Sequence, residues 1–333
     1  MNTPSITFFC ELHSPDLEKL FSSPTLIPQL RRMGANISMG IQDFSAERVK
    51  IIKKLTRAGV PVTAWLLLSV EEGYWTSLDT IHLTEKKYTD FLAWTRSNDL
   101  TWAAVGLDIE PRIDFMQRLA TTFPGQLPFL AQRFFSLRKY AHLEREARDL
   151  IARIRDDGYA VETYQFPTVI EERRANSTLL ARLFGLPALD ADREVLMLYS
   201  SMFDRAGEAI LWSYAREIDA VGVGSTGGGV SIEGLPTLHK MRWLDLKRDL
   251  LIAAHHASHL YIFSLEGCVE QNFLDRLETL DWQSPQPLPT QKAREITLFR
   301  RVFQYTLWML SHPIPSFLTF FPLVYLIFRR KTK

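Results

Sequence analysis

The stretch Val105-Gly106-Leu107-Asp108-Ile109-Glu110-Pro111 is an apolar run that ends in two carboxylates. Because side chains alternate along a β-strand, a strand through this run places Asp108 and Glu110 on the same face. Pro111 cannot donate a hydrogen bond to a sheet, so it ends the strand just beyond them. Folding gives little reason for two adjacent acids at the end of a strand, whereas catalysis does. The stretch therefore predicts a strand with a reactive site at its carboxyl end.

Short β-rich apolar runs alternate with longer helical segments before residue 285. Strands are expected at residues 6–12, 36–41, 60–68, 103–109, 159–164, 194–199, 220–223 and 259–263. Helices are expected at 46–58, 84–97, 129–157, 205–217, 238–255 and 269–280. An insertion at 112–128 could form a lid, a lipid-facing patch or a helix on the rim. Strands that alternate with helices predict a parallel sheet, and eight of them close a barrel. The predicted fold is α/β, a single (β/α)8 TIM barrel over residues 1–283.

The composition bounds the compartment and the partners. In 333 residues, 39 Lys and Arg nearly balance 38 Asp and Glu, so overall charge does not favour nucleic acid as a partner. Two cysteines, Cys10 and Cys268, fit a reduced compartment. The first residues lack a basic region followed by an apolar core, so no secretory signal is expected. We therefore expect the barrel in the cytoplasm.

The C-terminal region has the composition of a membrane segment. Residues 302–328 include no Asp, Glu, Lys or Arg and are flanked by basic residues on both sides. A straight helix of this length would span a bilayer core of about 30 Å. Basic residues at both ends, and prolines within the run, favour a re-entrant hairpin over a single transmembrane crossing. We expect a Pro-rich linker at 284–297 and a membrane anchor at 298–333, so that the barrel is membrane-associated.

In a barrel of this type the reactive groups gather at the carboxyl ends of the strands. The catalytic candidates there are Asp108, Glu110 and Tyr199. The substrate-binding candidates are Glu11, His13, Gln42, Trp75, Tyr164, Gln165, Ser264 and Glu266. Carboxylates beside aromatic rings suit a carbohydrate, because sugar rings stack on aromatic faces and their hydroxyls need hydrogen-bond partners. The site is expected to work without a cofactor or a metal.

A mechanism follows from the acid pair, Asp108 and Glu110. If Glu110 lies in a partly apolar pocket beside an ionised Asp108, burial and the like charge both raise the pKa of Glu110. An acid that keeps its proton near neutral pH can protonate a glycosidic oxygen. Same-face residues on a strand have Cβ atoms about 6.5–7 Å apart, so the two carboxyl groups can share a hydrogen bond. Such closeness suits substrate-assisted catalysis, in which one acid positions the amide of the substrate itself.

These residues resemble a known family. Leu107-Asp108-Ile109-Glu110 resembles the end of the fourth-strand signature of family 18 glycoside hydrolases, the chitinase-like barrels, which finishes in Asp-x-Glu. Met197-Leu198-Tyr199 resembles the Met-x-Tyr motif of that family on strand six. The resemblance implies that Glu110 is the general acid, that Asp108 is its partner and that Tyr199 holds an acetamido group. The Asp-x-Glu motif is also similar to that of the lysozyme-like family 25 barrels. We expect a hydrolase of glycosidic bonds that acts on a carbohydrate or a glycolipid at a membrane.

Two alternatives stay open. The family's earlier acidic positions fall on Ala103 and Gly106, and Ser200 stands where an Asp is usual. Strand eight also lacks the expected Trp. The barrel could therefore bind a carbohydrate without cleaving it. A metal-dependent phosphodiesterase-like barrel is the other alternative, with a divalent ion held by Glu11, His13, Asp43 and Glu266.

Overall fold

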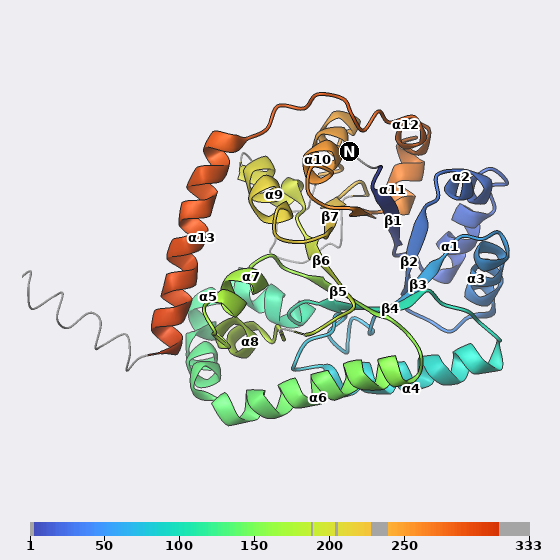
Figure 1. Cartoon of the computed structure of the whole chain (residues 1–333). Helices are drawn as coiled ribbons and strands as arrows, with labels where there is room; N and C mark the ends of the chain where they lie inside the picture. The colour runs from blue at the N-terminus through green and yellow to red at the C-terminus, as the bar shows by residue number, and fades with distance from the viewer. Residues whose placement is uncertain (1–2, 188, 204–205, 228–238, 313–333) are drawn as a thin grey trace, which may run out of the picture.

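Eight parallel strands close into a barrel in the computed structural model, which describes residues 3–187, 189–203, 206–227 and 239–312 (Figure 1). Neighbours in the barrel are also neighbours in sequence, and β8 pairs with β1 so that Phe9 lies opposite Phe263. The strands are β1 Ser5–Cys10, β2 Asn36–Ile41, β3 Val62–Leu66, β4 Ala104–Ile109, β5 Val161–Gln165, β6 Arg193–Met197, β7 Ala220–Gly224 and β8 His259–Phe263. Each expected strand overlaps one of these, so the predicted α/β barrel is confirmed.

Helices form a ring around the barrel (Figure 1). The described helices are α1 Ser14–Phe21, α2 Leu26–Arg32, α3 Ala46–Arg57, α4 Ile81–Ser97, α5 Ile113–Phe135, α6 Leu137–Asp156, α7 Val169–Arg174, α8 Leu179–Phe184, α9 Gly207–Ala215, α10 Trp243–Ala253, α11 Leu265–Glu270, α12 Leu274–Glu278 and α13 Thr290–Ser311, with a 3-10 turn η1 at Ser200–Met202.

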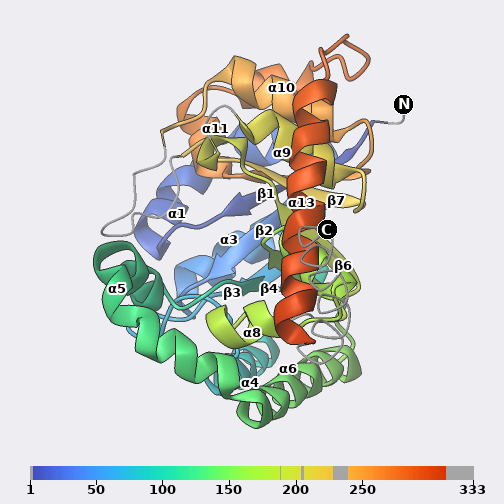
Figure 2. The ribbon, with the colours of Figure 1, turned by 90° about the vertical axis from the view of Figure 1, so that its left-hand side faces the viewer.

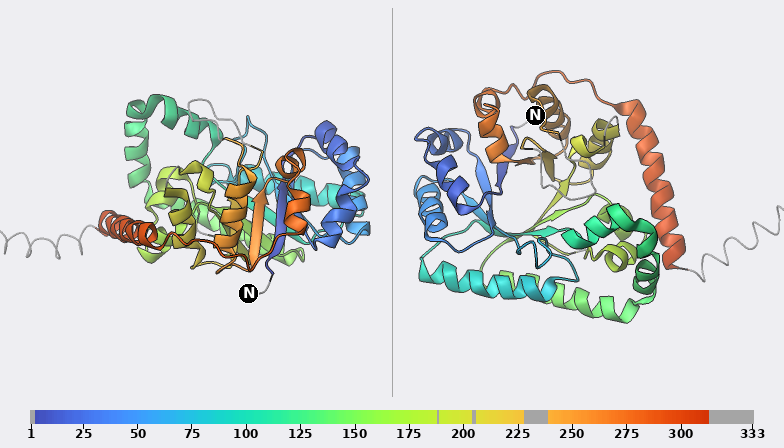
Figure 3. Two further views of the ribbon diagram at one scale, coloured as in Figure 1. Left: turned by 90° about the horizontal axis from the view of Figure 1, so that it is seen from above. Right: turned by 180° about the vertical axis from the view of Figure 1, so that it is seen from behind.

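The insertion after β4 is helical. Helix α5 covers it and continues beyond it, with a kink at Thr122, whose backbone is not helical. Pro124 follows directly in the first turn after the kink, where a backbone N–H is not needed for the helix. In the view from above, the strands run upward from the N-terminus and α5 stands on the side where they end (Figure 3, left).

The alternation of side chains divides the core into two layers. On β4, Val105, Leu107 and Ile109 pack against the surrounding helices, so Gly106 and Asp108 face the barrel axis. The Tyr164 hydroxyl fills the interior beside Gly106, and a Cβ at this position would collide with it. An interior layer of aromatic rings thus lies directly below the carboxyl ends of the strands.

The C-terminal segment differs from the expected linker and anchor. Helix α13 begins within the expected linker, 284–297, and continues through residues 298–311 of the expected anchor. It packs along α9 and α7 on one flank of the barrel (Figure 2). In the described part of the chain, no helix is both long and apolar enough to cross a bilayer. The rest of the expected anchor, 313–333, lies outside the described residues.

Arg300 attaches α13 to the barrel. Its side chain is buried, and its Nε donates a hydrogen bond to Glu171 Oε1 at 2.6 Å. Its Nη1 donates to the Ser213 carbonyl at 2.8 Å and lies 2.9 Å from Glu217 Oε1. The guanidinium also lies 3.6 Å from the centre of the Tyr214 ring. A buried arginine with two carboxylates thus holds α13 against the barrel.

Replacing Arg300 by Ala is expected to lower the free energy of unfolding by about 3–5 kcal/mol, because Glu171 would stay buried without its cation. Arg301→Ala is the matched control, since Arg301 is the exposed neighbour on the same helix. The control should change the free energy by less than about 0.5 kcal/mol. Urea unfolding followed by circular dichroism measures both, and equal stability of the two variants would contradict the assignment.

Candidate active site

A cavity inside the barrel, here called the central cavity, opens at the carboxyl ends of the strands. It encloses about 710 Å³, including space open to solvent. It is lined by Phe9, Glu11, Trp65, Trp75, Asp108, Glu110, Tyr164, Phe166, Met197, Tyr199, Met202, Ser225 and Phe263. Most of these are aromatic, and the three acids come from the ends of two strands. The cavity therefore brings together six of the predicted site residues: Glu11, Trp75, Asp108, Glu110, Tyr164 and Tyr199.

The acid pair is held in place by the loop that follows β3. Thr76 in this loop pairs with Ile109 as an isolated parallel bridge. The Thr76 N–H donates to the Asp108 carbonyl at 2.8 Å, and the Glu110 N–H donates to the Thr76 carbonyl at 3.2 Å. The backbone on both sides of Ile109 is thus fixed, so the two carboxyl groups stay on one face of the extended chain.

Burial and mutual repulsion set the protonation of the acid pair. Asp108 is 3% exposed, and its Oδ1 is buried without a hydrogen-bond partner. Burial, followed by the charges of Glu110 and Glu11, raises the pKa of Asp108 well above its usual range. Burial also raises the pKa of Glu110 to about 7, while a hydrogen bond from Asp108 acts in the opposite direction. The expectation of an ionised Asp108 is therefore wrong: Asp108 is the deeper acid and keeps its proton, and Glu110 titrates near neutral pH.

Glu11 faces the acid pair from the end of β1. The Tyr74 hydroxyl donates a hydrogen bond to Glu11 Oε1, and Gln42 Nε2 donates to the Tyr74 hydroxyl at 3.1 Å. Burial raises the pKa of Glu11 to about 8, and the charges of Glu266 and Glu110 add to this effect against the Tyr74 bond. Glu11 is therefore a third carboxyl group that carries a proton near neutral pH.

Tyr199 lies among these acids. Burial and the charges of Asp108, Glu110 and Glu11 raise its pKa well above the usual range. Its ring packs beside Phe263 with the ring centres 6.0 Å apart. The Tyr199 hydroxyl consequently stays neutral and can donate a hydrogen bond to a group bound in the cavity.

A second cavity, here called the side pocket, adjoins the central cavity. It holds the predicted residues His13, Gln42, Ser264 and Glu266. Burial raises the pKa of Glu266, and the Glu11 N–H donates to Glu266 Oε1 at 3.4 Å. The predicted set is therefore divided between two adjoining spaces.

Two predicted substrate-binding residues need correction. Gln165 lies on the outer face of β5, where its Nε2 donates to Thr163 Oγ1 at 3.0 Å. Since Tyr164 faces the barrel axis, the next residue must face the helices. Only the ring of Tyr164 is offered to the cavity, because its hydroxyl is bonded to Ser38 Oγ at 2.6 Å and to Glu162 Oε2 at 3.1 Å inside the barrel.

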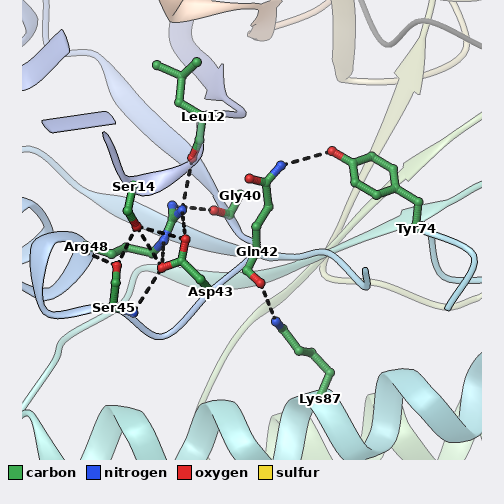
Figure 4. A network of polar contacts seen from close by, with 9 residues as sticks. All are labelled: Leu12, Ser14, Gly40, Gln42, Asp43, Ser45, Arg48, Tyr74 and Lys87. Carbon is green, nitrogen blue, oxygen red and sulfur yellow. Dashed lines mark hydrogen bonds and ion pairs between the residues drawn. The ribbon is translucent and has the colours of Figure 1, made fainter. Parts of the chain in front are cut away.

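Asp43, which was expected as a metal ligand, forms an ion pair with Arg48 (Figure 4). Its Oδ2 lies 3.0 Å from Arg48 Nη2, and its carboxylate also accepts from Ser14 Oγ at 2.9 Å and from the Ser45 N–H at 3.0 Å. Burial alone would raise the pKa of Asp43, but the bonds from Arg48 and Ser45 lower it well below its usual range. Over the described residues, no group of three or more His, Cys, Asp or Glu side chains could hold a metal ion. The ligand set of the phosphodiesterase-like alternative is therefore not assembled.

Strand-end reasoning misses several residues of the site. Phe9, Trp65 and Phe263 lie on the inner face within or just at the end of their strands, and the period of two back from Glu11 to Phe9 is the signal that finds them. Tyr74 adopts a φ of 69°, which an L-residue rarely takes and which a sequence pattern does not reveal. Ser225, whose buried Oγ has no partner, belongs to an irregular loop without a pattern.

The chain is similar to several solved structures at low identity. No family model and no curated protein matches it. The PgaB (BpsB) glycoside hydrolase domain from Bordetella bronchiseptica is 11% identical over 86% of this chain and 100% of that chain, with a TM-score of 0.46. A xylose isomerase domain protein from Planctomyces limnophilus is 12% identical over 92% and 100%, with a TM-score of 0.43. A tryptophan synthase complex from Pyrococcus furiosus is 11% identical over 83% and 96%, also with a TM-score of 0.43. At these identities and TM-scores, the three solved structures give no information about the chemistry of this chain.

Glu11→Gln is expected to stabilise the protein increasingly as pH rises. In the folded protein the pKa of Glu11 is about 8 against an ordinary 4.5, so folding retains a proton that the unfolded chain releases. Wild-type stability therefore falls between these two pH values, and a Gln at this position removes that fall. We expect equal melting temperatures at pH 4 and a gain of roughly 5 °C at pH 8.

The exposed Glu71 on the β3–α4 loop supplies the control, since Glu71→Gln should show no such pH dependence. Differential scanning calorimetry at several pH values measures the difference. If wild type and Glu11→Gln melt at the same temperature at pH 8, Glu11 is not a buried, protonated acid.

Proposed function

We propose that this protein hydrolyses a glycosidic bond of a carbohydrate or glycolipid, with Glu110 as the general acid and Asp108 as its partner. The observation that carries the proposal is the proton-sharing acid pair at the mouth of an aromatic cavity. Glu110 is the partly exposed member, so it can reach a bound substrate, whereas Asp108 is buried beneath it. A carboxylic acid with a pKa of about 7 is suited to give a proton near neutral pH.

The arrangement assigns each residue of the acid pair a step. Glu110 transfers its proton to the glycosidic oxygen as the bond to the sugar carbon breaks. This transfer leaves a carboxylate on Glu110, and the protonated Asp108 stabilises that carboxylate by donating a hydrogen bond to it. Water then adds to that carbon and gives a proton back to the Glu110 carboxylate, which completes the hydrolysis. Tyr199 keeps a neutral hydroxyl that can donate to the substrate's own amide or to another polar group of the sugar.

The walls of the central cavity fit a sugar ring. Trp65, Trp75 and Phe263 line it together with Phe9, and the acids lie at the ends of β1 and β4. Aromatic faces pack against the apolar C–H faces of sugars, and carboxyl groups bind their hydroxyls. This combination favours a carbohydrate over a wholly apolar ligand.

The surface of α5 supports the membrane part of the proposal. Phe123 (54% exposed), Leu127 (53%) and Phe135 (78%) stand free on this helix, and residues 115–143 include no Asp or Glu. Exposed apolar side chains among basic ones suit the surface of an anionic lipid bilayer. Because α5 stands on the side where the strands end, a bilayer against it would lie near the cavity mouth (Figure 3). This placement suits a glycolipid substrate.

Glu110→Gln is expected to lower kcat/KM by about 10²–10⁴-fold on the glycosides that the wild type cleaves, because the general acid is lost. Wild-type kcat/KM should fall as pH rises through about 7, where Glu110 loses its proton. A panel of chromogenic glycosides assayed across pH measures both effects. Glu71→Gln, outside the cavity, should keep full activity.

Two results would overturn the proposed reaction. One is a wild-type protein that cleaves no glycoside of the panel at any pH. The other is a Glu110→Gln variant that retains wild-type kcat/KM, because loss of the general acid must slow cleavage of the glycosidic bond.

The double change Phe123→Ser and Leu127→Ser is expected to abolish binding to phosphatidylserine-containing vesicles in a flotation assay. Leu244→Ser is the matched control, since Leu244 is 73% exposed but belongs to α10. Vesicles of phosphatidylcholine alone should bind the wild type more weakly, because the basic residues lose their partner. Binding by the double variant equal to that of the wild type would contradict the role of α5.

A further inference from the structure

The side pocket is a separate space with its own chemistry. It encloses about 590 Å³, including space open to solvent. The lining residues that matter below are Glu11, His13, Gln42, Tyr74, Ser264 and Glu266. Glu11 and Phe263 line both this pocket and the central cavity, so a ligand bound in one can continue into the other.

A directed chain of hydrogen bonds leaves one acceptor unused at Gln42. The Tyr74 hydroxyl gives its single proton to Glu11, so it can only accept from Gln42. This fixes the Gln42 amide with Nε2 toward Tyr74 (Figure 4). Its Oε1 is consequently turned away, and it is buried without a hydrogen-bond partner. An unsatisfied buried acceptor is unfavourable, so it indicates a missing donor.

Glu266 presents a second unused acceptor. Its Oε1 accepts from the Glu11 N–H at 3.4 Å, while its Oε2 is buried without a partner. Both orphaned atoms that border the side pocket are therefore oxygens that accept hydrogen bonds. A ligand that completes this pocket must bring donors and not acceptors.

The charges around the side pocket favour a cationic donor. Glu11 and Glu266 line it, and the acid pair lies next to Glu11, yet no Lys or Arg is among its described lining residues. The nearby Arg48 is occupied by Asp43 and by the carbonyls of Gly40 and Leu12 (Figure 4). Lys87 donates to the Gln42 carbonyl at 3.2 Å, on the backbone side. Among the described residues, no Lys or Arg pairs with the carboxyl groups of Glu11 and Glu266.

We propose that the side pocket is a subsite for a protonated amino group, and that the substrate is a saccharide with a free amine on the unit next to the scissile bond. An ammonium group has three donors and one positive charge, and its charge favours ionisation of the carboxyl groups beside it. The bound amine therefore meets Gln42 Oε1 and the carboxylates of Glu11 and Glu266, whose protons it displaces. This inference rests on the proposed glycosidase function and adds the class of its substrate.

The test measures binding to the full chain with Glu110→Gln, so that no hydrolysis is needed. Titration calorimetry at pH 7 compares three tetrasaccharides of one linkage, built from glucosamine, N-acetylglucosamine or glucose. The glucosamine tetramer should bind at least about tenfold more tightly than the other two, because only it carries ammonium groups. Adding Glu266→Gln should reduce this preference to about twofold or less.

Two variants guard the interpretation. Glu11→Gln, which should fold stably, is expected to weaken the same preference, so a failure of the Glu266 variant to fold does not leave the proposal untested. Glu270→Gln is the matched control on α11, since Glu270 is exposed and pairs with Lys240 at 2.6 Å. It should keep the full preference for the amine.

The outcomes separate the two proposals. Equal binding of glucosamine and glucose tetramers would overturn the ammonium subsite in favour of hydroxyl donors. A preference for the acetylated tetramer, or an amine preference that survives both Glu266→Gln and Glu11→Gln, would also overturn it. An amine preference in a protein that cleaves no glycoside would keep the subsite and reject the hydrolase.

Discussion

The alternation of side chains along closed parallel strands is the constraint on which the site depends. Every second residue must face the axis, so Phe9 and Trp65 form an aromatic layer inside the barrel. The next inward position on β1 is Glu11, and on β4 it is Asp108, both at the top of that layer. The acids therefore lie on an apolar floor that excludes water from below, and burial is the first cause of the raised pKa of each.

Acids elsewhere in the barrel are paired with arginines. Glu171 is buried against Arg300, and Asp43 is held by Arg48, so each of these carboxylates has an arginine beside it. The acids at the mouth have none within the described lining of either cavity. Glu172, buried outside both cavities, accepts instead from the Leu180 N–H at 2.6 Å. Uncompensated burial of carboxyl groups opposes folding, so three such groups together at the mouth indicate a role in chemistry or binding. The contrast within one molecule separates structural acids from the acids of the site.

The fold could be predicted because each strand and helix has a strong local period, and because Asp108 and Glu110 have neighbouring positions in sequence. Which acid of the pair keeps its proton to higher pH could not be predicted, since this depends on how deeply each carboxyl group is buried. Gln165 was assigned by its place after a strand, although the period of two from Tyr164 already turns it outward. The apolar residues of α13 resemble a membrane segment, and only the contact of Arg300 with Glu171, 129 positions away, shows where this helix packs.

Glu11 connects the two cavities electrostatically as well as in space. Its charge is among the causes that raise the pKa of both Asp108 and Tyr199. A cation held between Glu11 and Glu266 would offset that charge and weaken its effect on the acid pair. Occupation of the side pocket would then change the protonation of the groups that act on the neighbouring bond. In such a site, binding of the amine and protonation of the acid pair are coupled electrostatically, because Glu11 interacts with both.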